Sequence, residues 1–320
     1  MPRFELAYRP PYDWPRALEF LAVRAIEGVE SVEGVESVEG GVWRRTVRWP
    51  LAADEVRSRG NDDKARARHG ANELRGWIAL RPCPDRCCAV LDCSDSLTPV
   101  ADALVQRVRA ALDFDCDPAA LERAYRGRAP YVPGLRLVGS FDGFELAVRA
   151  ILGQQISVAR ARTLAGRLVA VFGETLDDDL PPGAPSRLFP TAQSLAGGDA
   201  GVAADRIAAL GVIGIRARAI VALARACADG ELRLEPGAPV PPTLAMLHTI
   251  SGIGDWTAQY IAMRALCWRD AFPAGDLVLR RALGVDTPAQ ARAVAERWQP
   301  WRAYAVIGVW SGVAIDTPPG

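Results

Sequence analysis

Hydrophobic and polar positions alternate differently in residues 1–100 and in the rest of the chain. In the first part, apolar residues occur at every second position or in short β-branched runs, which is typical of strands. Ala17–Ile26 instead has helical spacing, with Leu18, Leu21 and Ala22 on one face. We therefore predict a small α+β domain with an antiparallel sheet, whose strands are Arg3–Tyr8, Val42–Trp49, Trp77–Leu80 and Ala89–Leu91.

Two stretches interrupt this pattern. Residues 28–39 contain the hexapeptide Gly-Val-Glu-Ser-Val-Glu twice in tandem. A unit of this length is too short for a solenoid, so we interpret the repeat as a short duplication within a loop. Residues 55–74 are highly charged and poor in apolar positions, which predicts a mobile surface loop.

From about Asp102 onward the apolar positions recur at helical spacing. The clearest sets are Phe144, Val148, Ile151 and Leu152; Leu164, Leu168 and Phe172; and Ile215, Ala219, Ile220 and Leu223. A Pro- and Asp-rich stretch, Asp177–Pro185, separates two helical regions. Thr287-Pro288-Ala289-Gln290 has the pattern of a capping box with proline in the first turn, so we expect a helix that runs toward Trp298. These patterns predict an all-helical body.

Length and composition narrow the class of protein. A chain of 320 residues is long enough for about two domains, and a hydrophobic content of 50% is ordinary for a globular protein. Apolar runs such as Ala305–Trp310 are far shorter than the ~18 residues of a membrane span. Met1–Glu5 lacks the apolar core of a secretion signal, so we expect a cytoplasmic protein without membrane contact.

The balance of charges restricts how the chain can bind a polyanion. Lys and Arg number 38 and Asp and Glu number 38, which excludes a polycation that coats nucleic acid through bulk charge but leaves room for a local basic face. Lys64 is the only lysine.

The cysteines and histidines restrict the chemistry further. Seven cysteines, an odd number, fit reduced thiols, and the presence of only two histidines argues against a histidine-based triad and against a multi-histidine metal site. The cysteine cluster between Cys83 and Cys93 lacks the paired spacing of a zinc site, and Cys87 and Cys88 are expected on opposite faces of a strand.

The segment Leu247–Ala258 is the most informative part of the sequence. A short apolar helix leads into Gly252-Ile253-Gly254, and a second helix is expected to begin near Asp255. The two glycines permit a tight turn and the close approach of another backbone, while the free N–H groups of the second helix suit a phosphate. A simple helix–helix turn is the alternative.

A second segment, Phe272–Arg281, follows about twenty residues later. It places Asp276 after a Pro/Gly turn and before an apolar helix. An isolated Asp in such a place usually caps the helix. A cap position also fixes the carboxylate and lets it face a cleft, so both interpretations can hold.

Together these segments resemble the helix-hairpin-helix DNA glycosylases, whose Gly/Pro-rich loop ends in Asp. Further segments are similar to the DNA-3-methyladenine glycosylase II branch: Pro10–Trp14, Phe20–Arg24, Pro133–Arg136, Ala147–Ser157 and Trp298–Ala305. The resemblance covers nearly the whole chain and is weakest between Gly28 and Ala89. It implies an α+β fold in which a small N-terminal antiparallel-sheet domain (1–100) precedes an all-helical body of two subdomains (101–142 plus 269–320, and 143–268), with the site in the cleft between them.

The resemblance also implies an activity. Such an enzyme bends double-stranded DNA, rotates a damaged nucleotide out of the stack and cuts its N-glycosidic bond. Asp276 takes the position of the catalytic carboxylate, which stabilises the positive charge that develops on the sugar. The base pocket falls on Phe20, Trp256, Tyr260, Trp310 and Leu277, although each aromatic taken alone more often belongs to a core. Alkylated purines are already cationic, so aromatic faces can hold them by cation–π attraction.

The implied DNA-binding residues are Gly252, Ile253, Gly254, Thr257 and Ala258 of the hairpin, Gln155 at the wedge position, and Arg216 and Arg218. The two arginines belong to an acid-free stretch between Asp205 and Asp229 that otherwise fits a solvated helix face. The family further suggests a monovalent cation held by backbone carbonyls of His248, Ile250 and Ile253. We expect no other cofactor, and no iron–sulfur cluster, since no cysteine follows Cys267.

One position bears on the reaction class. Related bifunctional enzymes can carry a lysine just before the Thr-Ala of the hairpin, where this chain has Trp256. The sequence therefore predicts a monofunctional glycosylase. We also expect a monomer that acts on nucleoid DNA in a bacterial cytoplasm. Pro-Ala-Gly-Asp stands in place of the family's Gly-Pro-Asp and still fits a turn, whereas Ser311 after Trp310, where a tyrosine can occur, leaves the lesion range open. A glycosylase for deaminated or oxidised bases and a non-catalytic DNA-binding module remain as alternatives.

Overall fold

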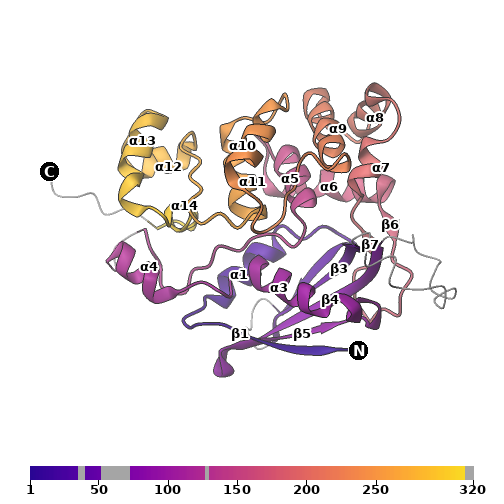
Figure 1. The fold of residues 1–320 in the computed structure, drawn as a ribbon, viewed down its shortest axis with the longest axis horizontal. Coiled ribbons are helices and arrows are strands. Elements are labelled where there is room, and N and C mark those ends of the chain that lie inside the picture. Colours follow the sequence, from indigo (N-terminus) through magenta and orange to yellow (C-terminus); the bar gives the residue numbers. More distant parts are fainter. Residues whose placement is uncertain (35–39, 52–72, 127–129, 314–320) are drawn as a thin grey trace.

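The computed structural model describes residues 1–34, 40–51, 73–126 and 130–313 (Figure 1). Within these ranges the sheet precedes a mostly helical body, which confirms the predicted fold class. None of the described helices is both long and apolar enough to cross a membrane. Lys64 and most of the predicted surface loop at 55–74 lie outside the described residues, whereas Glu73 and Leu74 begin a strand instead of ending a loop.

Five antiparallel strands form the sheet, in the order β1-β5-β4-β3-β2. One face of the sheet packs on helices α1 (Trp14–Ala22) and α3 (Ala101–Ala111), where Trp14, Leu18 and Leu104 meet the strand residues Val47 and Leu80. All four strands predicted from the alternating pattern are present. Their bounds are β1 Arg3–Ala7, β2 Glu30–Glu33, β3 Val42–Pro50, β4 Glu73–Cys83 and β5 Cys88–Cys93.

The prediction that the tandem repeat is a loop was wrong for its first copy. Residues Glu30–Glu33 of this copy are strand β2, which pairs with β3 so that Val32 lies opposite Trp43. The Val-Glu alternation fits an edge strand, because such a strand needs only one ladder partner and one buried face. Residues 35–39 of the second copy lie outside the described residues.

Helix α1 is shifted toward the N-terminus relative to its prediction and spans Trp14–Ala22. The Asp13 side chain caps it by accepting a hydrogen bond from the Arg16 N–H at 3.2 Å. The predicted end at Ile26 is wrong, because the helix already ends at Ala22 with Val23 as its C-cap. Ile26 lies beyond the helix and is buried in a core formed mainly by later helices. Three further short elements complete this half: η3 Pro84–Arg86, η4 Asp95–Val100 and α3 Ala101–Ala111.

The remaining helices form two hydrophobic cores, and Figure 1 shows most of these helices in the upper part of the view, with the sheet below. The first core contains α5 Gly143–Leu152, α6 Val158–Phe172, α7 Ala192–Ala196, α8 Ala200–Ala208, α9 Gly214–Ala228, α10 Val240–Thr249 and α11 Asp255–Ala265. The second contains α4 Pro118–Tyr125, α12 Leu277–Ala282, α13 Pro288–Ala295, η5 Glu296–Trp298 and α14 Arg302–Trp310. Helix α3 packs with the sheet instead, through Leu104 and Val108.

Two details of the helical body bear on the sequence analysis. Thr287 and Gln290 form the predicted capping box of α13, and η5 carries the chain on to Trp298. The body is not entirely helical, because β6 Glu174–Thr175 and β7 Arg187–Leu188 form a two-stranded ribbon around the Pro- and Asp-rich stretch.

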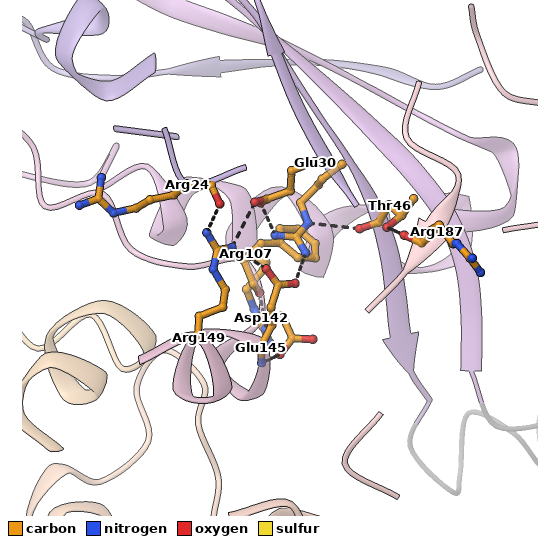
Figure 2. A network of polar contacts seen from close by, with 10 residues as sticks. Arg24, Glu30, Thr46, Arg107, Asp142, Glu145, Arg149 and Arg187 are labelled. Atoms are coloured by element: carbon orange, nitrogen blue, oxygen red, sulfur yellow. Dashed lines mark hydrogen bonds and ion pairs between the residues drawn. The ribbon is translucent and has the colours of Figure 1, made fainter. Parts of the chain in front are cut away.

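A buried network of charges joins the sheet domain to the helical body (Figure 2). Arg45 of β3 donates to Glu30 of β2 at 2.9 Å and to Glu145 of α5 at 2.8 Å. Arg149, one turn along α5, donates to the same two carboxylates and to the carbonyl of Arg24. The network therefore fixes α5 against the sheet and against the end of α1.

Candidate active site

The Asp276 carboxylate is held by three N–H groups from separate parts of the chain. Its Oδ1 accepts a hydrogen bond from the Leu279 N–H at 2.9 Å, so Asp276 is the N-cap of α12. Its Oδ2 accepts from Trp256 Nε1 at 2.8 Å, and Trp310 Nε1 lies 3.4 Å from Oδ1. The preceding Pro-Ala-Gly-Asp segment closes a turn in which the Asp276 N–H donates to the Pro273 carbonyl at 2.8 Å. Both sequence interpretations of Asp276 thus hold, as a cap and as a fixed carboxylate.

Three aromatic rings stand beside this carboxylate. Trp256 and Tyr260 lie one turn apart on α11 and stack with their ring centroids 5.3 Å apart and their planes 5° from parallel. Trp310, at the end of α14, is tilted against both rings, at 6.3 Å from Trp256 and 6.1 Å from Tyr260. All three rings are half-buried, which leaves part of their surface open to an occupant.

The carboxylate and the rings line one open cavity of about 1410 Å³. Phe20 at the end of α1 and the exposed Leu277 beside Asp276 also line it. The structure therefore brings together every residue that the sequence assigned to catalysis or to the base pocket: Phe20, Trp256, Tyr260, Asp276, Leu277 and Trp310. Flat aromatic faces can hold a planar cationic ring, and a fixed anion beside them can stabilise positive charge on the group attached to that ring.

The hairpin between α10 and α11 uses its two glycines differently. Gly252 has a φ of +96°, a conformation that side chains rarely adopt, and a Cβ there would lie 3.3 Å from the Cβ of Ala219. Gly254 has no such strain and no atom within 4 Å of the place where its Cβ would stand. Ile253, which lies between them, is buried and packs into the hydrophobic core beneath the turn. The fold therefore requires glycine at 252, whereas the missing side chain at 254 leaves an open surface.

Thr257 and Ala258, predicted to contact DNA, are buried. The Ala258 N–H donates to the Gly254 carbonyl at 3.0 Å, and the Thr257 hydroxyl accepts from Gln154 Nε2 at 3.1 Å. These two residues thus stabilise the hairpin and do not project from it. Gln154 also donates to the Gly252 carbonyl at 2.8 Å, and the sequence analysis missed this link because it depends on the contact between α5 and the hairpin.

The other predicted DNA-binding residues differ in their surroundings. Gln155 is exposed at the turn between α5 and α6, in the left-handed region with a φ of 54°, and it lines the cavity. Arg216 also lines the cavity but is only 8% exposed, whereas Arg218 is exposed. Arg225 donates to the carbonyls of Ala196 and Gly198, so the arginines of α9 do not form one uniform face.

The carbonyl groups proposed to hold a monovalent cation lie at the C-terminal end of α10 and in the hairpin. The carbonyls of His248 and Ile253 accept no hydrogen bond from any described residue, while that of Ile250 accepts from the Ile253 N–H at 3.0 Å. A set of backbone oxygens with free lone pairs fits a hard monovalent cation. The imidazole of His248 is exposed and lies 3.9 Å from the Asp255 carboxylate.

The cysteines of the sheet domain are arranged differently from the sequence prediction. Cys87 lies in the turn after η3 with a φ of 48°, and only Cys88 enters strand β5, opposite Cys83. The expected alternation of Cys87 and Cys88 across a strand is therefore wrong. Among the described residues, no group of three or more His, Cys, Asp or Glu side chains is placed to hold a metal ion.

Seven charged residues of the cavity wall escaped the sequence analysis. They are Glu30, Arg45, Glu145 and Arg149 of the buried network, Arg264 of α11, and Arg24 and Arg162. Burial alone raises the pKa of Glu145, but the charges of Arg45 and Arg149 outweigh this effect and hold that pKa below its usual range. Contacts such as that of Arg45 with Glu145 join distant parts of the sequence, so no local pattern marks these residues as part of a cavity wall.

Comparisons with known proteins identify the family of the chain. The family model described as AlkA N-terminal domain matches residues 3–142, and the one described as HhH-GPD superfamily base excision DNA repair protein matches residues 148–300. DNA-3-methyladenine glycosylase 2 of Escherichia coli is 35% identical over 308 residues, which cover 96% of each chain. A probable bifunctional transcriptional activator/DNA repair enzyme AlkA of Mycobacterium tuberculosis is 37% identical over 96% of this chain and 56% of its own length. The solved 3-methyladenine DNA-glycosylase of Archaeoglobus fulgidus has the same fold, with a TM-score of 0.68, 20% identity and 97% of both chains covered.

Proposed function

Because the chain belongs to the HhH-GPD superfamily of base excision DNA repair proteins, we propose that it is a DNA glycosylase for alkylated bases of the 3-methyladenine and 7-methylguanine type. One observation carries this proposal: the Asp276 carboxylate is fixed at the rim of a cavity walled by Trp256, Tyr260 and Trp310. A damaged nucleotide rotated out of the duplex places its base between such rings and its sugar beside the carboxylate.

In the proposed reaction the bond between C1′ of the sugar and the base nitrogen breaks, and the electron pair leaves with the base. The sugar becomes an oxocarbenium-like cation, which the Asp276 carboxylate stabilises. Water then attacks C1′ and loses a proton. The Trp256 and Leu279 N–H groups hold the carboxylate in one orientation throughout, so little reorganisation accompanies the charge that develops.

The base pocket suits a cationic base. An alkylated purine carries positive charge that the faces of Trp256, Tyr260 and Trp310 attract, by about 0.5–2 kcal/mol for each contact. Such a base leaves as a neutral molecule, so the site needs little acid catalysis.

The hairpin and Gln155 are proposed to bind the duplex. The N–H groups at the start of α11 have no side-chain cap and lie beside the open space at Gly254, which suits a phosphate. Gln155 is exposed at the mouth of the cavity, where it can fill the place of the rotated base, and Arg218 adds exposed positive charge. A cation bound by the carbonyls of His248, Ile250 and Ile253 would strengthen the phosphate contact. We further propose a monomer that acts on nucleoid DNA, in line with its bacterial relatives.

We also propose that the enzyme lacks strand-cleaving lyase activity. A Schiff base needs an amine at the sugar, but Trp256 occupies the hairpin position and holds Asp276 with its indole N–H. Borohydride reduction during turnover on lesion-containing DNA is expected to trap no covalent adduct. A robust cross-link would contradict this part of the proposal.

The decisive experiment replaces the carboxylate alone. In Asp276→Asn, excision of 3-methyladenine and 7-methylguanine from alkylated DNA should fall by about 100-fold or more, because the amide cannot offset the charge on the sugar. The amide oxygen can still cap α12, so lesion-DNA affinity should stay within about threefold of wild type. Excision at the wild-type rate would remove Asp276 from the mechanism. Best turnover of hypoxanthine or oxidised guanine by the wild type would replace the proposed substrate class.

A further inference from the structure

Arg264 lies on the same face of α11 as the two stacked rings, one turn beyond Tyr260 and two turns beyond Trp256. It lines the cavity that contains Asp276, yet it is only 4% exposed. The mechanism proposed above does not use this residue.

The guanidinium of Arg264 is buried without an anionic partner. Its Nη1 donates to the Val138 carbonyl, and its Nε is buried with no hydrogen-bond partner. No carboxylate of the described part of the chain lies within 4 Å of it, unlike Arg45 and Arg149, which neutralise the nearby Glu30 and Glu145. Burial lowers the pKa of Arg264 to about 10, which still leaves it positively charged at neutral pH.

A second cation shares the same aromatic wall. The Arg264 guanidinium carbon lies 4.4 Å from the centre of the Phe20 ring, and that of Arg24 lies 3.9 Å from it. Arg24 has no ion pair with any described carboxylate either, and its charge further disfavours the protonated form of Arg264. The wall of the cavity therefore carries the Asp276 carboxylate in one part and, around Phe20, two cations that have no ion pair with any described carboxylate.

We propose that Arg264 is a specificity-determining residue that promotes the departure of neutral damaged bases, such as hypoxanthine, and does little for cationic alkylated bases. This inference rests on the proposed function. When the C1′–N9 bond of a neutral purine breaks, the base keeps the electron pair and becomes an anion spread over its ring nitrogens and O6. A buried cation in the same cavity stabilises that anion strongly, because little water screens the interaction.

The balance of the reaction explains the selectivity. For a neutral base, water attacks C1′ and releases a proton to solvent, and the departing anion takes up a proton from solvent. A base methylated at N7 or N3 begins as a cation and leaves as a neutral molecule. Its departure therefore develops no negative charge for Arg264 to stabilise.

The test compares two leaving bases in otherwise identical duplexes. Single-turnover excision of hypoxanthine and of 7-methylguanine is measured at saturating enzyme for wild type, Arg264→Met and Arg264→Lys. We expect Arg264→Met to lower the hypoxanthine rate by about tenfold or more relative to the 7-methylguanine rate, whereas Arg264→Lys, which keeps the cation, retains most of the ratio. If Arg264→Met does not fold, Arg264→Gln provides the same comparison.

Arg136 offers a matched control. It is also 4% exposed, donates to backbone carbonyls, has unpartnered nitrogen atoms and does not line the large cavity. Arg136→Met should change both rates by the same factor. An equal loss of both rates in Arg264→Met would show a merely structural role and overturn the inference. A wild type that excises 7-methylguanine but not hypoxanthine would overturn it too, while leaving the proposed function intact; excision of neither would overturn both.

Discussion

At the scale of single residues, the site depends on hydrogen bonds to one carboxylate. The Leu279 N–H of its own helix holds one oxygen of Asp276. The indole of Trp256 holds the other oxygen, and the same ring also serves as a wall of the cavity. Trp256 therefore has two separable roles, of which only the hydrogen bond requires its nitrogen.

This separation gives a prediction for Trp256→Phe. The variant keeps an aromatic wall but loses the N–H to Asp276, and a hydrogen bond to a charged group contributes about 1.5–3 kcal/mol. The single-turnover excision rate of 7-methylguanine should fall by roughly tenfold to a hundredfold, with lesion-DNA affinity nearly unchanged. Tyr260→Phe, which keeps the stacked ring, serves as the control and should retain the wild-type rate within about threefold. A wild-type rate in Trp256→Phe would show that the carboxylate needs no indole to orient it.

At the scale of elements, contacts in the protein interior hold the hairpin between α10 and α11 in its conformation. Ile253 is buried, Gln154 of α5 bonds the Gly252 carbonyl and the Thr257 hydroxyl, and Gly252 permits the turn. Of the two hairpin glycines, only Gly254 has open space around its missing side chain. Folding thus requires Gly252, whereas the DNA contact that we propose falls to Gly254.

The two glycines should respond in opposite ways to alanine. Gly252→Ala should lower the free energy of unfolding by about 1–2 kcal/mol, because its φ of +96° is strained for any side chain. Gly254→Ala should leave stability within about 0.5 kcal/mol of wild type but weaken duplex binding by about tenfold, since its methyl group occupies the space for a phosphate. Urea unfolding and fluorescence anisotropy measure the two effects. Equal duplex affinity in Gly254→Ala and wild type would place the DNA elsewhere.

At the scale of the whole molecule, the network of Figure 2 connects the sheet domain to the helical body and forms part of the cavity wall. Glu145 is buried in it and bonds both Arg45 and Arg149. Breaking such a network leaves buried charges without partners, which costs more than the intact network contributes. It also holds the end of α1, which carries Phe20, through the bond from Arg149 to the Arg24 carbonyl.

Glu145→Gln should therefore lower the free energy of unfolding by about 3–5 kcal/mol. Glu231→Gln, which changes an exposed glutamate without an ion pair in the described structure, should change it by less than about 0.5 kcal/mol. Urea unfolding at neutral pH measures both. If Glu145→Gln lowered the free energy of unfolding no more than Glu231→Gln does, the network would not hold the sheet domain and the helical body together.

Acid should remove the same stabilisation from the wild type. The pKa of Glu145 in the folded protein lies below its ordinary value of 4.5, so its contribution is complete above that pH and is lost as the pH falls toward the folded value. The difference in unfolding free energy between wild type and Glu145→Gln should shrink progressively below about pH 4.5. A difference that stays constant through this range would contradict the assigned cause of the pKa shift.

Many secondary-structure elements and both site motifs of this protein can be predicted from its sequence, because the patterns that specify them are local. Alternation with period two predicts β1, β3, β4 and β5, and cap residues predict α13, since backbone geometry ties these patterns to one conformation. The Gly-Ile-Gly turn and the Asp after a Pro/Gly turn are also local. Their spacing and the resemblance they carry indicate the family and the candidate carboxylate.

Other features are decided only when distant segments meet. Residues 30–33 have a weak pattern and become a strand because β3 offers a free edge and Arg45 a partner for Glu30. The link from Gln154 to the hairpin and the unpaired charge of Arg264 in the cavity likewise depend on packing between helices far apart in the chain. The motif and the fold class follow from the sequence because local spacing encodes the conformation of each segment. The electrostatics of the cavity follow only from the tertiary structure, because burial and the pairing of charges depend on how distant segments pack together.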